Sequence, residues 1–237
     1  MKSVAVDTGG TFTDIVVLDQ ETGEVKVLKT PSTPADPGQA LLDGLAVLTG
    51  ASLSMADVAS LTHGTTVGTN MLIEGRGARV GLLLTAGFTG INDVWQIPRF
   101  GADLSDIYVE RNPPVEPWLR EEVVERVGHE GNVVTALDRD SALKAIRSLG
   151  AKGVESVAVV FLFSFLNDAH EREVGELIKA ELPGAMISLS ADILPQIREF
   201  PRLSTTVANA RLAPELTDYL HRLESRLRER GVATEQI

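Results

Sequence analysis

Two runs of apolar, mostly β-branched residues flank a pair of glycines near the start of this 237-residue chain. Val4–Val6 precedes the segment Asp7-Thr8-Gly9-Gly10-Thr11, and the apolar run within 12–19 follows it. Such runs around paired glycines predict a β-hairpin. A third strand is expected over 25–29, and a helix is expected to begin at Pro37. The chain is therefore predicted to open with three strands and a helix.

The remaining pattern alternates between strand and helix signals. Strands are expected over 58–62, 80–85, 157–165 and 186–189, and helices over 67–74, 138–149, 168–182, 204–209 and from Pro214 onward, with a turn at 63–66 and loops and edge strands over 87–131. The last helix places Leu216, Tyr219, Leu220, Leu223 and Leu227 on one face. This alternation predicts an α/β fold with a mixed or parallel sheet.

Composition excludes several classes of protein. The chain has no cysteine, which rules out thiol catalysis, cysteine-ligated zinc, iron–sulfur clusters and disulfides. Its formal charge of -11 disfavours nucleic acid as a partner. No apolar run reaches the 18 residues of a membrane span, and no signal peptide is indicated, so we expect no membrane partner and a cytoplasmic location.

The glycine turn has the residues of a phosphate site. Gly9 and Gly10 let the backbone approach a ligand, and successive amide groups can form an anion-binding concavity. Thr8, Thr11 and Thr13 add hydroxyl groups, while Asp7 and Asp14 add carboxylates that can hold Mg²⁺ through water. A tight hairpin whose threonines satisfy their own backbone is the alternative. Two acids and three threonines exceed what a turn needs, so we favour a polyphosphate with Mg²⁺.

Other phosphate and hydrolase motifs are missing. No Gly-Lys dipeptide occurs, which excludes a P-loop, and the third glycine of the dinucleotide-binding fingerprint is absent. Gly9 stands where an aspartyl-phosphate phosphatase needs its second Asp. The sequence also lacks the serine-hydrolase elbow and the zincin motif.

A second polar segment, Thr62-His63-Gly64-Thr65-Thr66, follows a predicted strand, where open α/β sheets bind ligands. His63 is either a structural histidine or a functional one, and its glycine and threonine neighbours raise the functional odds. His129 and His170 are interpreted as structural, and His221 is expected to face solvent.

At these two segments the chain resembles a known family. Residues 6–14 are similar to the opening of the hydantoinase A and 5-oxoprolinase family, and 62–70 resemble its second signature. Later stretches at 121–131 with Asp138, 158–171, and 198–206 with Asn209-Ala210 are also similar. The resemblance covers almost the whole chain.

The resemblance implies a ribonuclease-H-like lobe of the actin, sugar kinase and Hsp70 superfamily. We expect a phosphate-binding part over 1–86, an α/β insertion or subdomain over 87–213, and a C-terminal helix over 214–237 that leads to a second lobe. Gly9-Gly10 is the only Gly-Gly in the sequence, so the glycine loop of that second lobe is not found. The chain is interpreted as an N-terminal lobe that is inactive when isolated. The last helix either packs on the second lobe or covers the core of this one.

The implied activity is ATP-driven opening of a cyclic amide, in which the γ-phosphate activates the carbonyl before water cleaves the C–N bond. Expected partners are the cyclic amide, the second lobe and a hydantoinase B-type subunit. ATP and Mg²⁺ are the expected cofactors. The predicted site residues are His63 and Asp7 as catalytic groups, Asp7 also for Mg²⁺, Thr8, Gly9, Gly10, Thr11, Thr13 and Asp14 for the nucleotide, and Thr65, Thr66 and Asn70 for the substrate.

Two residues depart from the family pattern. Phe163 stands where a histidine is expected, and Asp168 stands where a proline is usual, so a polar substrate contact at 163 is lost. Two alternatives stay open: a subunit of an ATP-dependent ketone carboxylase, which shares these signatures, and a single-lobe binding module without turnover.

Overall fold

The computed structural model describes residues 1–33, 36–51, 54–93 and 113–232. The chain divides into two compact units. The first consists of Met1–Arg76 and Glu215–Ile237, and the second of Gly77–Pro214. The expected loops and edge strands over 87–131 lie partly outside the described residues. In the described part of the chain, no helix is long and apolar enough to cross a bilayer.

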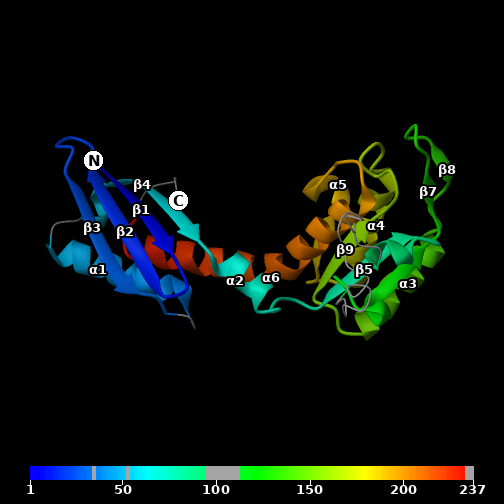
Figure 1. Ribbon diagram of the computed structural model, residues 1–237, viewed down its shortest axis with the longest axis horizontal. Coiled ribbons are helices and arrows are strands. Elements are labelled where there is room, and N and C mark those ends of the chain that lie inside the picture. Colours follow the sequence, from blue (N-terminus) through cyan, green and yellow to red (C-terminus); the bar gives the residue numbers. More distant parts are fainter. Residues whose placement is uncertain (34–35, 52–53, 94–112, 233–237) are drawn as a thin grey trace, which may run out of the picture. The chain divides into compact units, whose positions relative to one another are not determined.

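The first unit is built on one mixed four-stranded sheet (Figure 1, blue to cyan). Its elements are β1 (Lys2–Thr8), β2 (Phe12–Asp19), β3 (Val25–Pro31), α1 (Pro37–Ala51), a 3-10 turn η1 (Met55–Asp57), β4 (Val58–Thr65), α2 (Val67–Ile73) and the end of α6 (Glu199–Glu229). The strand order is β3-β2-β1-β4, with β4 parallel to β1 and the other pairs antiparallel. The predicted three strands and helix are confirmed.

Alternation along the strands gives this sheet one covered face. Val6 and Ile15 are opposite each other in the register and are both buried. They join a core cluster that includes Leu41 and Leu45 of α1. Tyr219, Leu223 and Leu227 of α6 belong to the same cluster, so the predicted apolar stripe covers the core of its own unit, although Leu220 is half-exposed.

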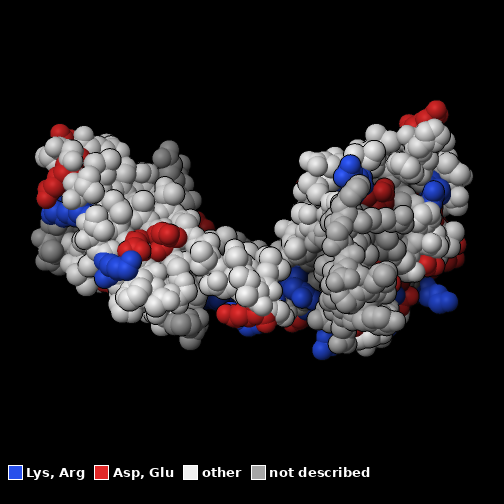
Figure 2. All heavy atoms as spheres, in the orientation of Figure 1, with Lys and Arg blue, Asp and Glu red and all other residues white. Residues whose placement is uncertain are grey.

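The helices of the core cluster, α1 and α6, pack on the covered face, and the opposite face of the sheet has exposed apolar side chains. Leu18, Val25 and Val27 of this face are 39%, 57% and 69% exposed. Figure 2 shows a mostly uncharged surface over these strands, with acidic and basic groups beside each other. Asp14 and Lys29 form such a pair, with 2.9 Å between Nζ and Oδ1.

The second unit contains a parallel four-stranded sheet with the order β10-β9-β5-β6. Its elements are β5 (Val80–Thr85), η2 (Thr89–Asn92), η4 (Pro117–Leu119), β6 (Arg120–Val123), the hairpin β7 (Arg126–Val127) and β8 (Val133–Thr135), α3 (Arg139–Ala151), β9 (Ser156–Val160), α4 (Ala169–Glu181), β10 (Met186–Leu189), α5 (Ser190–Ile193) and the start of α6.

One face of this second sheet packs on α3 and α4, and the other packs on Leu203, Val207 and Ala210 of α6. The predicted strand and helix alternation over 138–189 and the Asp138 cap are confirmed, since its carboxylate accepts from the amides of Asp140 and Ser141.

The expected end of one strand is wrong. The strand expected to reach 165 ends at Val160, because the next two amides donate to side chains. Phe161 N–H donates to Glu171 and Leu162 N–H donates to Thr85 Oγ1. The chain then turns through Phe163, which has a φ of 56°.

The helices expected at 204–209 and from Pro214 are one helix, α6, with Pro214 in its interior. A proline there removes one backbone hydrogen bond. Residues on both sides of it are held by core contacts, Val207 and Ala210 in the second unit and Tyr219 and Leu223 in the first. These core contacts outweigh the local preference of Pro214 for a helix break.

Candidate functional site

The two signature segments meet at one end of the first sheet. In the parallel register of β1 and β4, Val6 is opposite His63 and Thr8 is opposite Thr65. The amide of Thr66 donates to the Thr8 carbonyl at 3.1 Å. The turn expected at His63 is therefore wrong, because pairing with β1 extends β4 through Thr65.

Asp7 and His63 do not share a face of the sheet. Successive strand residues point to opposite faces. His63 lies opposite the buried Val6, on the covered face, while Asp7 lies opposite Gly64 on the exposed face. The two predicted catalytic residues thus lie on adjacent register positions and on different sides.

The glycine turn has amides available to a ligand. Gly9 N–H donates to the Phe12 carbonyl at 3.0 Å, and a Cβ on Gly9 would lie 3.1 Å from that oxygen. A side chain at this position would therefore crowd the turn. The amides of Gly10 and Thr11 donate to no residue that the structure describes.

The two acids of the first motif have different environments. Asp14 is paired with Lys29, whereas the exposed Asp7 carboxylate has no hydrogen bond or ion pair within the described ranges. Gly64 lies beside it, and a Cβ there would be 3.5 Å from Asp7 Oδ1. The absence of a side chain at Gly64 keeps the space beside the carboxylate open.

The threonines of the first motif also differ. Thr13 Oγ1 is 3.0 Å from Ser32 Oγ and is thereby satisfied, while Thr11 is exposed. Thr8 is only 1% exposed, and its hydroxyl has no hydrogen-bond partner. A buried hydroxyl without a partner carries a free-energy penalty that a ligand or water can remove.

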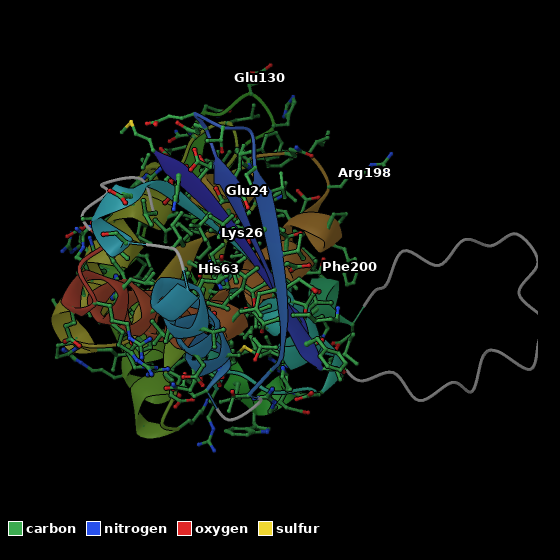
Figure 3. All side chains as sticks on the ribbon, turned by 90° about the vertical axis from the view of Figure 1, so that its left-hand side faces the viewer. Glu24, Lys26, His63, Glu130, Arg198 and Phe200 are labelled. Carbon is green, nitrogen blue, oxygen red and sulfur yellow. The ribbon has the colours of Figure 1, made fainter. Side chains whose placement is uncertain are left out.

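His63 has a partner that the sequence did not indicate. Its Nε2 lies 2.7 Å from the hydroxyl oxygen of Tyr219. Burial lowers the pKa of His63, against smaller opposing effects of the Val6 backbone and the Asp7 charge. Burial, with the charge of Asp36, raises the pKa of Tyr219 to about 12. Both groups are therefore neutral near pH 7. Figure 3 labels His63 in the first unit.

A cavity of about 420 Å³ lies at the carboxyl end of β1. Thr8, Gly9 and Gly10 form part of its wall, together with the predicted substrate residues Thr66 and Asn70. Tyr219 of α6 also lines it. All of these residues belong to the first unit. The predicted substrate residue Thr65 is exposed and is not among the residues that line this cavity; its Oγ1 accepts from the amide of Val67 at 3.2 Å.

The other predicted features contribute less to this site. Of the remaining histidines, His170 is buried with Nδ1 2.7 Å from Glu125 Oε2, and His129 and His221 are exposed. Phe163 and Asp168 belong to the second unit, where Asp168 pairs with Arg172. The described residues contain no cluster of three metal-ligating side chains, so a metal at Asp7 would need further ligands from water or phosphate.

Comparison with known proteins identifies the family. The model for the hydantoinase/oxoprolinase N-terminal region matches residues 3–182. The chain belongs to this family. It is 34% identical to the caprolactamase subunit alpha of Pseudomonas jessenii, and the match covers 96% of this chain and 34% of that protein. It is 30% identical to the 5-oxoprolinase of Saccharomyces cerevisiae, and the match covers 94% of this chain and 20% of that protein.

Solved structures support the family and the α/β fold class. An ATP-dependent caprolactamase from Pseudomonas jessenii matches 99% of this chain with a TM-score of 0.88 and 33% identity. A nucleotide-free acetone carboxylase matches 97% of it with a TM-score of 0.84 and 28% identity. In each case the match covers 34% of the other chain. The family member described here thus spans about a third of these relatives.

Proposed function

We propose that this chain is the N-terminal, ATP-phosphate-binding and substrate-contacting part of an ATP-dependent cyclic amidohydrolase. Membership of the hydantoinase/oxoprolinase family supports this proposal, as do the similarities to a caprolactamase and a 5-oxoprolinase. The division proposed from the sequence, with a ribonuclease-H-like phosphate-binding part, a subdomain and a second lobe, remains part of the proposal.

The observation that carries the proposal is the turn after β1. The amides of Gly10 and Thr11 have no described acceptor, and Asp7 has no described partner. Free amides suit phosphate oxygens, and an unpaired carboxylate suits a hydrated Mg²⁺. ATP with Mg²⁺ would supply the phosphoryl group. The residues present fit such a ligand, because a Cβ at Gly9 would fill the turn and Gly64 leaves space beside Asp7.

We assign separate roles to the groups around the turn. Asp7 holds the metal through water, and the residues predicted for the nucleotide surround the phosphates. Asn70 and Thr66 contact the cyclic amide, since both line the cavity. His63 acts on the substrate carbonyl together with Tyr219, because the two are hydrogen-bonded. A second ATPase lobe and a hydantoinase B-type subunit complete the enzyme.

A ketone carboxylase subunit is the second candidate. The chain is 30% identical to the acetophenone carboxylase gamma subunit of Aromatoleum aromaticum, and the match covers 98% of this chain and 34% of that protein. The acetone carboxylase structure is a further match. A carbonyl phosphorylated on oxygen would serve both reactions. The non-catalytic binding module remains the third reading.

Product analysis on the complete enzyme with its partner subunit tests these candidates. The enzyme is given ATP with hydantoin, 5-oxoproline, a simple lactam, or a ketone with bicarbonate. We expect a ring-opened product in step with ADP formation. Carboxylated ketone as the sole product would support the second candidate, and no product with tight nucleotide binding would support the binding module.

A further inference from the structure

The parallel sheet of the second unit has a carboxyl end that the proposed function does not use. Its two central strands, β5 and β9, are neighbours in the order β10-β9-β5-β6 (Figure 1). The chain leaves β5 toward β6 on one side, and it leaves β9 through α4 toward β10 on the other. Open parallel sheets bind ligands at the carboxyl ends of such a pair of strands. A ligand of this unit is therefore expected there.

The buried ionisable side chains that the structure describes in this unit are all linked to that end of the sheet. They are Glu125, His170, Glu171 and Arg202. Thr85, the last residue of β5, donates its hydroxyl to Glu125. Phe161, directly after β9, donates its amide to Glu171 and accepts from Arg202 Nη2 at 2.8 Å. Burial of charged groups costs free energy that an apolar core avoids, so their concentration at one end points to a use besides packing.

Glu125 holds the imidazole of His170 in one orientation. The Oε2 atom of Glu125, a residue only 3% exposed, lies 2.7 Å from His170 Nδ1. The other oxygen accepts from the Thr85 hydroxyl, which itself accepts from the amide of Leu162 at 3.0 Å. An ionised carboxylate can only accept hydrogen bonds, so Nδ1 carries the hydrogen. The second ring nitrogen, Nε2, then presents its lone pair.

The Nε2 atom of His170 is open. Within the described ranges it has no hydrogen-bond partner, and the side chain is 9% exposed. The fully buried side-chain atoms without a partner include Arg202 Nε but not this nitrogen, so a solvent molecule or ligand reaches it. A structural role for His170 explains the contact of Nδ1 and gives Nε2 no function. A carboxylate behind an imidazole whose other nitrogen is open is the arrangement of a general base, because the carboxylate stabilises the imidazolium.

The backbone after the two central strands turns sharply. Gly87 follows β5 with a φ of 83°, and Phe163 follows β9 with a φ of 56°. The left-handed conformation is unfavourable for a residue with a side chain. The carbonyl of Phe163 accepts from the amides of Leu166 and Asn167 at 2.9 and 3.2 Å, which holds this turn ahead of α4. The turn thereby fixes the position at which His170 enters the helix.

The chemistry of these groups selects the class of ligand. A metal ion would find His170 alone, because the described residues contain no cluster of three metal-ligating side chains and both Glu125 oxygens are hydrogen-bonded. An anion would meet the negative charge of the buried Glu125 carboxylate. A neutral O–H or N–H group matches the lone pair of Nε2.

We propose that the carboxyl end of the second sheet is a second ligand site, in which Nε2 of His170 accepts a hydrogen bond from an O–H or N–H group of a small uncharged molecule. When that molecule reacts, its proton moves to Nε2, its electron pair stays on the oxygen or nitrogen, and Glu125 balances the imidazolium charge. Thr85 is a positioning residue for the carboxylate. The inference concerns the second unit alone and does not depend on the proposed function.

Acylation by diethyl pyrocarbonate tests the open nitrogen, because the reagent attacks an unprotonated ring nitrogen that it can reach. The full 237-residue chain is treated at neutral pH, and each histidine is followed by peptide mass mapping. We expect His170 to react within about fivefold of the rate of the exposed His129. Glu125→Gln should slow the reaction of His170 about tenfold, and Thr85→Val about threefold, with the rate of His129 unchanged.

Phenol and its methyl ether, anisole, test the ligand class, since they share one ring and differ in the O–H donor. Their effect on the His170 ring resonances is followed by NMR. We expect phenol to shift these resonances saturably and to slow acylation, and anisole to bind at least about fivefold more weakly. His170→Asn should abolish phenol binding, whereas His129→Gln is the matched control at an exposed histidine. A melting curve for each variant verifies the fold.

The wild-type measurements decide the outcome even if a buried variant fails to fold. A His170 that stays unmodified while His129 reacts completely would overturn the inference. So would the absence of a shift with phenol, equal shifts with phenol and anisole, or phenol binding that survives in a folded His170→Asn. An unchanged rate of His170 acylation in a folded Glu125→Gln would also contradict it.

Discussion

The imidazole Nε2 of His63 lies 2.7 Å from the hydroxyl oxygen of Tyr219, a residue 156 positions further along the chain. The pair joins the second signature segment to α6 at the wall of the cavity. Neither group carries a charge near neutral pH, because burial lowers the pKa of His63 and raises that of Tyr219. The pair therefore suits hydrogen bonding and proton transfer to a neutral carbonyl compound.

Loss of His63 should uncouple the complete enzyme. In His63→Ala, ATP hydrolysis without substrate should persist while ring opening falls roughly 10²-fold, a typical loss of general acid–base help. Tyr219→Phe should reduce ring opening less, by about tenfold, because it removes one hydrogen bond. ADP and ring-opened product are measured side by side. A parallel decline of both activities with a lowered melting temperature would reject the catalytic role of His63.

Asp7→Asn should lower ATP-dependent turnover of the complete enzyme by about 10²-fold or more, because it preserves shape and removes the charge directed at the metal. The fold should be unchanged, since Asp7 is exposed and unpaired within the described ranges. Asp43→Asn serves as the control with full activity. Wild-type turnover with unchanged Mg²⁺ dependence in Asp7→Asn would show that Asp7 is only a turn residue.

The stability of the chain should depend on the charge of His63. Its folded-state pKa lies below the ordinary value of 6.5, so the unfolded chain binds the proton more readily. With respect to this group, the free energy of unfolding is at its full value above pH 6.5, and it decreases as the pH falls through the folded-state pKa. Melting temperature is measured at pH 7.5 and 5.5. The drop should be smaller in His63→Gln than in the wild type by about 2 °C, and equal drops would contradict the burial of a neutral imidazole.

A buried network in the second unit should show strong coupling. Glu171 and Arg202 are 0% and 1% exposed and are linked through Ser190, which donates to Glu171 and accepts from Arg202. Burial raises the pKa of Glu171 and lowers that of Arg202. Arg202→Met should destabilise the fold by roughly 3–5 kcal/mol, because it leaves a buried carboxylate without its cation.

The double variant Glu171→Gln with Arg202→Met should lose less free energy of unfolding than the sum of the single changes. Urea titrations of the four proteins measure this. Additive losses would mean that the two charges act independently.

Gly77 should not tolerate a side chain. It has a φ of 125°, and a Cβ there would lie 2.6 Å from the carbonyl oxygen of Arg211. The amide of Ala78 donates to that same oxygen, so the backbone cannot move away freely. Gly77→Ala should cost more than about 2 kcal/mol. Gly75→Ala, at φ 67° in open space, should cost about 1–2 kcal/mol. Similar losses in both would contradict the close approach.

Local patterns in the sequence determined much of the fold. The glycine hairpin, the helix at Pro37 and the Asp138 cap depend on turn residues, periodicity and capping, which act over a few positions. The same holds for the α/β class and for the turn residues proposed to bind phosphate. The motif order also identified the family, which the match over 3–182 shows.

Tertiary contacts decided what those patterns left open. Pairing with β1 made His63 a strand residue and placed it on the covered face, opposite to Asp7. Packing in two cores kept α6 continuous through Pro214. The Tyr219 partner of His63 lies 156 positions further along the chain, and three of the charged residues that line the cavity, Glu215, Asp218 and Arg222, come from the same distant helix. Such contacts depend on which elements the chain packs together, and periodicity along the sequence does not specify them.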